Sequence, residues 1–374
     1  MPRFDPVARL LPALRTLPEY QALEDPGEVA ARYGLTPAEV IKVDGNENPY
    51  GPSPRALEVL RTLGYRAEWY GADDHALRAA LGGRLGVPAE CIVAGPGSDD
   101  LIDQVFRMYL GPGNGGPSDA IVIASPTFGM YAFDAGLHGV EVRDVPRLDD
   151  WSLDADALVE AARTAKAVFL PSPNNPTGGL LPPALADRLL ETGALLVVDE
   201  AYIEFSDASS LVARAAVEDG LIVLRTLSKW GGLAGLRIGY AVMNLRTADL
   251  FHRAQQPYHV NVAAEAAAIA SVEDATILDE RARILVAERE RVTRELACIE
   301  WIEPVPSQAN FVLMRLHRGD GLTLRDRLRA RGIFTRYFET PRLRDHLRIS
   351  MARPEQNDRV IAAIREIGEE LAHG

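Results

Sequence analysis

Four short apolar runs follow one another along the middle of the chain, and each leads directly into polar or aromatic residues. The runs cover residues 120–123, 167–170, 194–198 and 221–224. Their length, their β-branched residues and the turn residues around them are typical of strands buried on both faces, as in a parallel sheet. Helical patterns separate them, which indicates an α/β fold. A further run at 237–243 follows its predecessor so closely that we expect the two to pair antiparallel.

The pattern changes toward both ends of the chain. After helical periodicity over 275–296, several strand-like segments and a closing helix suggest a smaller α+β domain. The first 40 residues are interrupted by prolines and contain no core of their own. We therefore predict an N-terminal arm over 1–40, which packs on the small domain or on a neighbouring subunit, a large domain over 41–270 and a small domain over 271–374.

Composition and charge exclude several classes of partner. Forty basic and 53 acidic residues give a formal net charge of −13, which argues against nucleic acid or an anionic membrane as a partner. The two cysteines, Cys91 and Cys298, form no C-x-x-C pair, so we expect no disulfide framework, no metal site and a reducing, cytoplasmic environment. The first residues lack the apolar stretch of a signal peptide, and we expect no membrane span.

The residues that follow the apolar runs are the candidate functional residues. Phe128 follows the first run, Asn175 the second, Asp199 and Tyr202 the third, and Lys229 the fourth. Each has a plain alternative: Asp199 as a helix cap, Phe128 as a core residue, Asn175 as a turn former. Because the carboxyl ends of parallel strands share one edge, where open α/β sheets bind ligands, we expect these side chains to meet in one crevice.

Lys229 is the expected chemical centre of that crevice. It lies in the segment T-L-S-K-W-G-G-L-A-G-L-R-I-G-Y, residues 226–240, just beyond a strand end. Apolar neighbours at Leu227, Trp230 and Leu233 predict a desolvated amine with a lowered pKa, which is nucleophilic toward a carbonyl carbon. Taken alone, a lysine in a glycine-rich turn is more simply explained as a solvated residue. Its placement beside the other strand-end residues favours the catalytic interpretation.

A second glycine-rich turn predicts a phosphate site. Gly97, Ser98 and Asp99 stand between a strand and a helix, where free backbone N–H groups and the helix dipole favour an anion. The turn matches only part of the dinucleotide motif G-x-G-x-x-G, and the full match at 111–116 follows a helix instead of a strand. No G-x-x-x-x-G-K-[ST] motif occurs. A Rossmann dehydrogenase and a P-loop nucleotidase are therefore both disfavoured.

Pyridoxal 5′-phosphate (PLP) fits this set of residues. Its aldehyde suits the amine of Lys229 as a Schiff-base partner, and its pyridine nitrogen, when protonated, suits the carboxylate of Asp199. Asn175 and Tyr202 can donate to its phenolic oxygen, and Phe128 can stack on its ring. The residues placed to bind its phosphate are Gly97, Ser98, Asp99, Ser228 and Arg237.

The same motifs resemble a known family over about residues 18–355. N-N-P-T-G at 174–178, D-E-A-Y at 199–202 and the lysine segment look like fold-type I PLP-dependent aminotransferases of class II. Four further motifs are similar to the histidinol-phosphate aminotransferase branch of that family. They are N-E-N-P-Y-G-P-S-P at 46–54, P-Y-H-V-N at 257–261, S-Q-A-N-F-V at 307–312 and L-R-I-S at 347–350.

The resemblance implies a large domain with a mostly parallel, seven-stranded sheet between helices, and a smaller α+β domain. It implies transamination between L-histidinol phosphate and 2-oxoglutarate in histidine biosynthesis. It also implies a homodimer with a shared active site, in which Tyr70 reaches the cofactor phosphate of the neighbouring subunit. The residues that it assigns to substrate binding are Tyr20, Asn46, Arg336 and Arg348.

Two departures from the family pattern concern substrate preference. The chain has Tyr70-Gly-Ala-Asp73 where Tyr-Pro-Asp is usual, and Pro257-Tyr-His259-Val where Pro-Tyr-Asn-Val is usual. Three other functions therefore stay open at this stage: an aromatic amino-acid aminotransferase, a threonine-phosphate-type decarboxylase with nearly the same cofactor site, and a non-catalytic descendant of the fold.

Overall fold

A seven-stranded sheet lies at the centre of the fold, with strand order β2-β8-β7-β6-β5-β3-β4. We describe it from a computed structural model that covers residues 10–17, 24–63, 67–71, 73–111 and 119–373. The strands are β2 (Ile92–Gly95), β3 (Ala120–Ile123), β4 (Glu141–Asp144), β5 (Ala167–Pro171), β6 (Leu195–Asp199), β7 (Leu221–Thr226) and β8 (Gly239–Val242). Strands β3 to β7 pair in parallel, whereas β8 runs antiparallel to both β7 and β2. The predicted mostly parallel sheet is therefore confirmed, and so is its one reversed strand.

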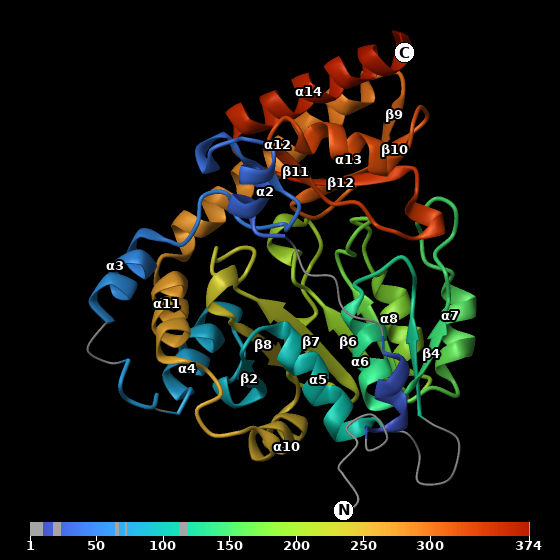
Figure 1. The fold of residues 1–374 in the computed structure, drawn as a ribbon. Coiled ribbons are helices and arrows are strands. Elements are labelled where there is room, and N and C mark those ends of the chain that lie inside the picture. The colour runs from blue at the N-terminus through green and yellow to red at the C-terminus, as the bar shows by residue number, and fades with distance from the viewer. Residues whose placement is uncertain (1–9, 18–23, 64–66, 72, 112–118, 374) are drawn as a thin grey trace, which may run out of the picture.

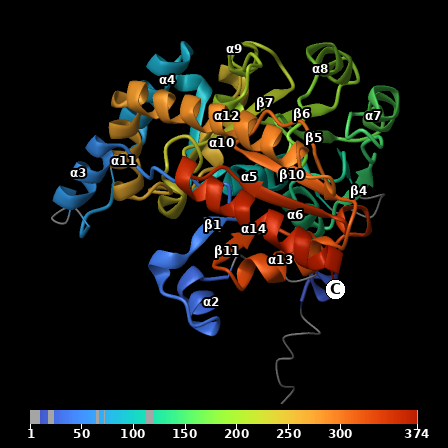
Figure 2. The same cartoon turned by 90° about the horizontal axis from the view of Figure 1, so that it is seen from above.

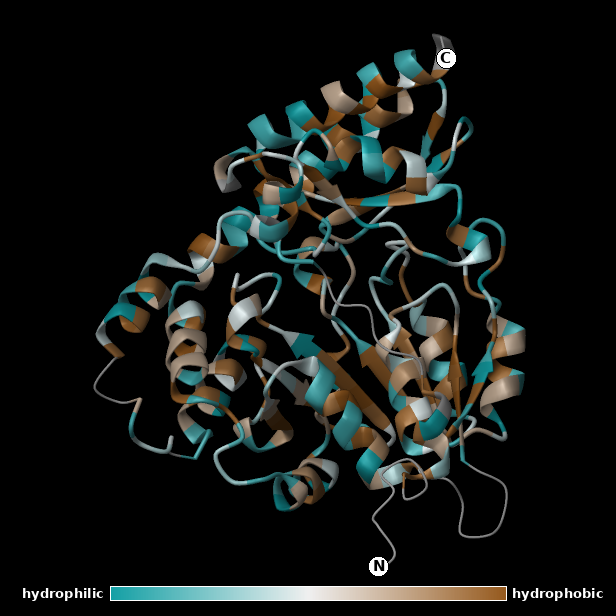
Figure 3. Ribbon diagram, viewed as in Figure 1, coloured by the Kyte–Doolittle hydropathy of each residue, from teal (hydrophilic) through white to brown (hydrophobic). Residues whose placement is uncertain are grey.

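Side chains on the two faces of this sheet enter two separate cores. On one face, Phe169 and Ile222 pack with residues of α5 (Ser98–Tyr109), α6 (Met130–His138) and α10 (Leu245–Ala254). On the other face, Val168 and Val198 pack with residues of α7 (Ala155–Ala162), α8 (Pro183–Leu190) and α9 (Val212–Ala215). Figure 3 shows mostly apolar strands between these helices. Burial on both faces explains why the strands read as continuous apolar runs.

A smaller region covers the edge of the sheet at which the parallel strands end, as Figure 1 shows. Its antiparallel sheet has the order β12-β10-β9, and a separate parallel pair joins β1 to β11. Figure 2 shows α2 beside that pair. These strands are β1 (Ile41–Val43), β9 (Ile302–Pro304), β10 (Phe311–Leu316), β11 (Ile333–Thr335) and β12 (His346–Ser350). Residues from both ends of the chain therefore lie above the large sheet. The division of the chain after residues 40 and 270 stays a prediction.

The remaining helices complete the two regions. The α-helices are α2 (Pro26–Arg32), α3 (Pro54–Thr62), α4 (His75–Leu85), α11 (Val262–Glu273), α12 (Ala275–Ala297), α13 (Gly321–Arg329) and α14 (Pro354–His373). The short 3-10 helices are η1 (Pro12–Thr16), η2 (Pro37–Glu39), η4 (Ala89–Cys91), η5 (Ile203–Phe205), η6 (Ala234–Leu236) and η7 (Pro341–Leu343). Helix α12 rises from the large sheet to the smaller region in Figure 1, and its bounds agree with the periodicity over 275–296.

Strand β11 is short and continues as a single β-bridge. The segment 333–338 forms a strand only as far as Thr335, and Arg336 then makes an isolated antiparallel bridge to Arg348. Two backbone hydrogen bonds, of 3.0 and 2.9 Å, close that bridge. Since residues opposite one another in an antiparallel pair point to the same face, the two arginines are neighbours.

Candidate active site

A cleft lies at the carboxyl ends of β5, β6 and β7, beneath the smaller region. The predicted residues that line it are Ser98, Asp99, Phe128, Asn175, Asp199, Tyr202, Ser228, Lys229 and Arg237. Three other predicted residues contact members of this lining: Gly97, Asn46 and Arg348. The shared strand edge therefore gathers residues from separate parts of the sequence, as expected for an open α/β sheet.

Lys229 lies at the centre of the cleft. Its Nζ donates a hydrogen bond of 2.8 Å to the carbonyl oxygen of Gly45. Burial, followed by the positive charges of Arg348 and Lys42, lowers the pKa of Lys229 to about 8. Because an ammonium group is stabilised by water, removing that water favours the neutral amine. The side chain is therefore suited to attack a carbonyl carbon and to exchange protons near neutral pH.

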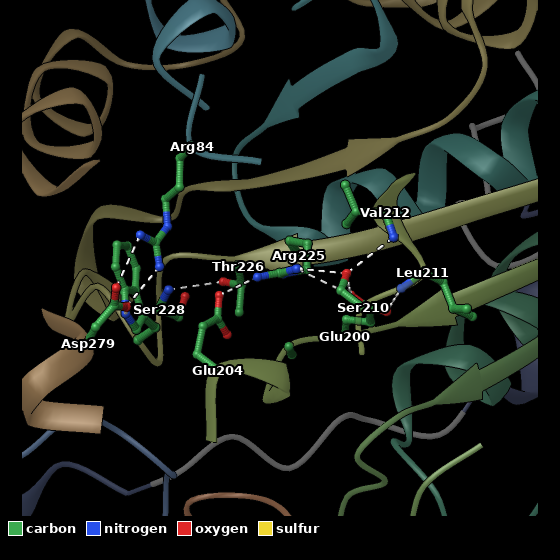
Figure 4. A network of polar contacts seen from close by, with 12 residues as sticks. Arg84, Glu200, Glu204, Ser210, Leu211, Val212, Arg225, Thr226, Ser228 and Asp279 are labelled. Carbon is green, nitrogen blue, oxygen red and sulfur yellow. Dashed lines mark hydrogen bonds and ion pairs between the residues drawn. The ribbon is translucent and has the colours of Figure 1, made fainter. Parts of the chain in front are cut away.

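The backbone around Lys229 is held in place by Trp230. The indole is buried, its Nε1 donates to Asp279 at 2.8 Å, and the guanidinium of Arg84 stacks on its ring at 4.2 Å. Asn48 donates to the carbonyl of Trp230 at 3.1 Å. The labelled Arg84, Asp279 and Ser228 lie together on one side of Figure 4. Contacts from α4, α12 and the segment before α3 therefore fix the loop that carries the lysine.

Asp199 ends β6 and is almost fully buried. Burial raises its pKa to about 6, although hydrogen bonds from the hydroxyl of Tyr131, at 2.9 Å, and the N–H of Ala201, at 3.0 Å, oppose that rise. The ring of Tyr131 meets Phe128 edge to face, with centroids 5.6 Å apart. Sequence reasoning gave Tyr131 no role. The available signal was its position three residues after Phe128, at the start of α6.

Polar side chains from distant segments close the cleft above Lys229. The hydroxyl of Tyr202 accepts a hydrogen bond of 3.0 Å from Asn46, and burial raises the pKa of Tyr202. Arg348 donates to Asn175 at 2.6 Å and to the carbonyl of Asp44. Asn46 has a φ of 54°, in the left-handed region that non-glycine residues seldom adopt. The segment around Asn46 is therefore held in an unusual conformation by its contacts across the cleft.

Arg336 and Arg348 form a positively charged pair at the edge of the cleft. They are opposite one another in the β-bridge, and their guanidinium groups lie 5.6 and 5.7 Å from the ring of Phe338. Like charges opposite each other in a sheet are unfavourable unless an anion lies between them. The pair is therefore suited to bind a phosphate or carboxylate group.

The turn before α5 has the geometry of a phosphate site. Helix α5 begins at Ser98, directly after Gly97, whose φ is 94°. A Cβ on Gly97 would lie 2.7 Å from a guanidinium nitrogen of Arg237. Arg237, which also has a left-handed φ of 52°, donates to Asp99 at 2.8 Å. Helix-start N–H groups, the hydroxyl of Ser228 and this guanidinium provide the donors that the phosphate of PLP requires.

Two more aromatic residues, Tyr20 and Tyr70, are predicted for the site. Tyr20 lies outside the described residues. Tyr70 is 83% exposed and stacks on Tyr258, with ring centroids 4.7 Å apart. Its predicted contact with the cofactor of a neighbouring subunit stays a prediction.

A buried ion network joins the ends of β6 and β7 behind the cleft. Arg225 donates to Glu204 at 2.6 Å and to both Glu200 and Ser210 at 3.2 Å. Figure 4 shows Arg225 between Glu204 on one side and Glu200 with Ser210 on the other. All three charged side chains are at most 10% exposed. Glu200 directly follows Asp199, and Arg225 lies four residues before Lys229. The network therefore links the backbone segments that carry Asp199 and Lys229.

Two kinds of feature are absent from the part of the chain that the structure describes. Within it, His, Cys, Asp and Glu side chains do not gather into a group of three that could hold a metal ion. Within the same residues, no helix combines the length and apolar character needed to cross a membrane.

Comparison with known proteins shows which family this fold and cleft represent. Residues 38–364 match the family described as aminotransferase class I and II, and the chain belongs to that family. It is 45% identical to the histidinol-phosphate aminotransferase of Roseiflexus castenholzii over 96% of this chain and 98% of that protein. Its identity to the chloroplastic histidinol-phosphate aminotransferase of Nicotiana tabacum is 37%, over 96% of this chain and 86% of that protein.

The fold is likewise similar to a solved structure in that group. This is the crystal structure of the histidinol-phosphate aminotransferase from Sinorhizobium meliloti in complex with pyridoxal-5′-phosphate. The TM-score is 0.86 at 30% identity, over 97% of this chain and 98% of that one. The predicted fold class is therefore confirmed, as is the prediction of an aminotransferase.

Proposed function

We propose that this protein transfers the amino group of L-histidinol phosphate to 2-oxoglutarate, giving imidazole acetol phosphate and L-glutamate, as a step of histidine biosynthesis. The observation that carries the proposal is the meeting of Lys229, Asp199 and Arg348 in one cleft. It provides a nucleophilic amine, a buried carboxylate and an anion-binding guanidinium. The 45% identity to a histidinol-phosphate aminotransferase supports this choice of substrate.

The residues of the cleft fit PLP as the cofactor. Bound PLP supplies an electron sink for negative charge that forms on the substrate carbon. Asp199 is placed to hold the proton on the ring nitrogen by a charge-assisted hydrogen bond. Asn175 and Tyr202 would donate to the phenolic oxygen, and Phe128 would stack on the ring. The phosphate set consists of Gly97, Ser98, Asp99, Ser228 and Arg237.

Lys229 has two roles in this proposal. Its Nζ would hold the cofactor at the aldehyde group when no substrate is bound. With an amino substrate in place, the free amine would act as the general base and acid that takes a proton from the amino-bearing carbon of the substrate and returns it. A pKa of about 8 suits both roles, since the amine can accept and return a proton near neutral pH.

The substrate anions bind at the other end of the cleft. Arg348 and Arg336 receive the phosphate of histidinol phosphate in one half-reaction and a carboxylate of 2-oxoglutarate in the other. Asn46 holds Tyr202 and the segment above Lys229 in place, and it lies where a bound substrate would contact it. Tyr20 completes this set by resemblance to the family.

The active unit in this proposal is a homodimer in the cytoplasm. Tyr70 provides a hydroxyl to the cofactor phosphate of the neighbouring subunit, and its exposed stack with Tyr258 is suited to such an interface. Cys91 and Cys298 are both free thiols, as is common in a reducing compartment.

A substrate panel tests the proposal. The purified enzyme with PLP and 2-oxoglutarate is given histidinol phosphate, phenylalanine or threonine phosphate, and glutamate and CO₂ are measured. We expect glutamate chiefly from histidinol phosphate. Glutamate from phenylalanine alone, or CO₂ from threonine phosphate, would overturn the substrate assignment.

Chemical trapping tests the role of Lys229 separately. Borohydride reduction should attach PLP to the peptide that contains Lys229, as detected by mass spectrometry. Lys229→Ala should abolish both the attachment and transamination, whereas Lys166→Ala, which removes an exposed lysine, should retain both. A Lys229→Ala enzyme that still transaminates would contradict the assignment.

A further inference from the structure

Glu47 differs from the other carboxylates that line the cleft. Among the described residues these are Glu47, Asp99 and Asp199. Asp99 is paired with Arg237, and Asp199 accepts hydrogen bonds from Tyr131 and Ala201, all on the side assigned to the cofactor. Glu47 instead comes from the segment above Lys229, and its side chain is 40% exposed, as is that of Asp99. Its position, and not its exposure, therefore makes it the lining carboxylate on the side assigned to the substrate.

Gly45 contacts both Lys229 and Glu47, and so shows where Glu47 lies relative to the amine of Lys229. The carbonyl of Gly45 accepts the hydrogen bond from Lys229. A Cβ on Gly45 would lie 2.5 Å from Oε2 of Glu47 and 2.9 Å from Nζ of Lys42. The carboxylate of Glu47 is thus packed against the residue that contacts Lys229. A substrate whose amino group reaches Lys229 passes close to this carboxylate.

The upper part of the cleft therefore offers two opposite charges to a substrate. Arg348, with Arg336 beside it, is suited to an anion, and Glu47 is suited to a hydrogen-bond donor or a cation. Histidinol phosphate has both complements on one small skeleton, a phosphate and an imidazole with an N–H group. Glutamate and 2-oxoglutarate carry only carboxylates beyond the reacting carbon and have no donor for Glu47.

We propose that Glu47 is a specificity-determining residue, whose carboxylate accepts a hydrogen bond from the imidazole N–H of the amino donor. This inference rests on the function proposed above. A hydrogen bond to a charged acceptor discriminates strongly against an analogue that lacks the donor, because the carboxylate then loses water without gaining a partner.

Lys42 allows the carboxylate of Glu47 to lie in the cleft during both half-reactions. Its Nζ lies 2.5 Å from Glu47 and 3.0 Å from Asp44, from a position on β1. The ammonium group fixes the direction of the carboxylate and offsets its charge. Because Glu47 is paired in this way, a dicarboxylate can enter the same cleft with less repulsion. The competing explanation is that Glu47 serves only to anchor Lys42.

A pair of amino donors separates the two explanations. One is histidinol phosphate, and the other is 2-amino-3-phenylpropyl phosphate, which has the same skeleton with a phenyl ring in place of the imidazole. For each enzyme form, kcat/KM is measured for both donors, and their ratio is the discrimination. We expect Glu47→Ala to lower this ratio about 10- to 100-fold, and Glu47→Gln to lower it less, because the amide oxygen still accepts a hydrogen bond.

Two further variants serve as controls. Lys42→Met keeps the carboxylate and removes its partner, so its discrimination should fall less than that of Glu47→Ala. Glu58→Gln replaces an exposed glutamate of α3, whose side chain is 64% exposed, and should leave the ratio unchanged. The PLP absorbance of each variant checks that the cofactor side of the cleft is intact.

The outcomes distinguish this inference from the function on which it rests. If the wild type prefers histidinol phosphate and Glu47→Ala keeps the wild-type ratio, Glu47 does not recognise the imidazole and the inference is overturned alone. An equal fall in Lys42→Met and Glu47→Ala would assign the effect to the ion pair and would also overturn it. If the wild type fails to use histidinol phosphate at all, the proposed function is overturned together with the inference.

Discussion

At the floor of the cleft, Asp199 and Lys229 follow neighbouring parallel strands, whereas at its rim Asn46 and Ser350 meet from opposite ends of the chain. The floor residues are positioned by the register of β6 with β7. The rim is closed by side-chain contacts, in which Ser350 Oγ accepts from the N–H of Asn46 at 2.9 Å and donates to its side chain at 2.8 Å. A sheet therefore fixes the first region, and a few hydrogen bonds between distant segments fix the second.

Asn46 and Ser350 are themselves buried, but the charged side chains of the two regions differ in exposure. Behind the floor, Arg225, Glu200 and Glu204 are almost fully buried. At the rim, the side chains of Lys42 and Glu47 are 26% and 40% exposed. Buried charges without partners are costly, while partly exposed ones remain solvated. We therefore expect changes at the floor to affect chemistry and folding, and changes at the rim to affect binding and choice of substrate.

The largest effect is expected at Asp199. An amide in Asp199→Asn carries no negative charge to hold a protonated ring nitrogen, so kcat should fall about 10³- to 10⁴-fold. Tyr131→Phe is the matched control, because it removes only one hydrogen bond to that carboxylate and should cost about tenfold. Single-turnover kinetics with bound PLP would measure both. If Asn at this position kept a tenth of the wild-type kcat, Asp199 could not have the proposed role.

The next largest effect is expected on stability, from the network behind the floor. Arg225→Met leaves Glu200 and Glu204 buried without their cation, so the free energy of unfolding should fall by about 3–5 kcal/mol. Arg214→Met, which breaks ion pairs of a side chain that is 35% exposed, should cost less than about 1 kcal/mol. Urea denaturation of the PLP-bound proteins compares the two. Equal losses of unfolding free energy in the two variants would show that the stability of the floor does not depend on its buried charges.

The difference between floor and rim explains how much of the site the sequence could predict. Asp199 and Lys229 each follow an apolar run, and parallel strands bring their carboxyl ends together in any register, so their meeting needed no long-range information. The phosphate turn at Gly97 was predictable for the same local reason. By contrast, nothing local pairs Asn46 with Ser350, because that contact joins residues separated by 304 positions.

The buried network was missed for a different physical reason. The apolar run ends at Leu224 in sequence, and the polar residues after it mark the end of the predicted strand. In the structure β7 continues to Thr226 and is buried on both faces, so Arg225 is buried whichever face it points to. A charged residue at a strand end is predicted to be exposed unless its partners are known. The partners of Arg225 are Glu200, which directly follows β6, and Glu204, which lies in η5.

The buried amine at the floor should make stability depend on pH in the cofactor-free protein. The pKa of Lys229 is lowered from 10.5 to about 8, so between these values the unfolded chain binds a proton that the native state does not. Stability should therefore rise with pH through that window, and the full penalty, at most about 3 kcal/mol, is present below pH 8.

Lys229→Met removes this titration. The variant should be more stable than the cofactor-free wild type at pH 7, and the difference should shrink as pH rises toward 10.5. Urea midpoints at pH 7, 8.5 and 10 would measure this convergence, with Lys166→Met as the matched exposed control. A difference between Lys229→Met and the wild type that stays constant over this range would show that Lys229 is not desolvated.

The smallest effect is expected at the rim, where Asn46 combines hydrogen bonds with a left-handed backbone. Asn46→Ala removes the side-chain hydrogen bonds to Tyr202 and Ser350, keeps the backbone hydrogen bond to Ser350, and leaves a Cβ at a φ of 54°, so it should cost about 1–2 kcal/mol of stability and raise KM about tenfold. Asn46→Gly removes the same contacts but tolerates that φ without strain. The difference in stability between the two variants measures the strain of the left-handed backbone. The rise in KM that both variants show measures the loss of the side-chain hydrogen bonds. If the glycine variant binds substrate as the wild type does, the rim is positioned by the folding of the two regions and the bonds across the cleft are not needed for binding.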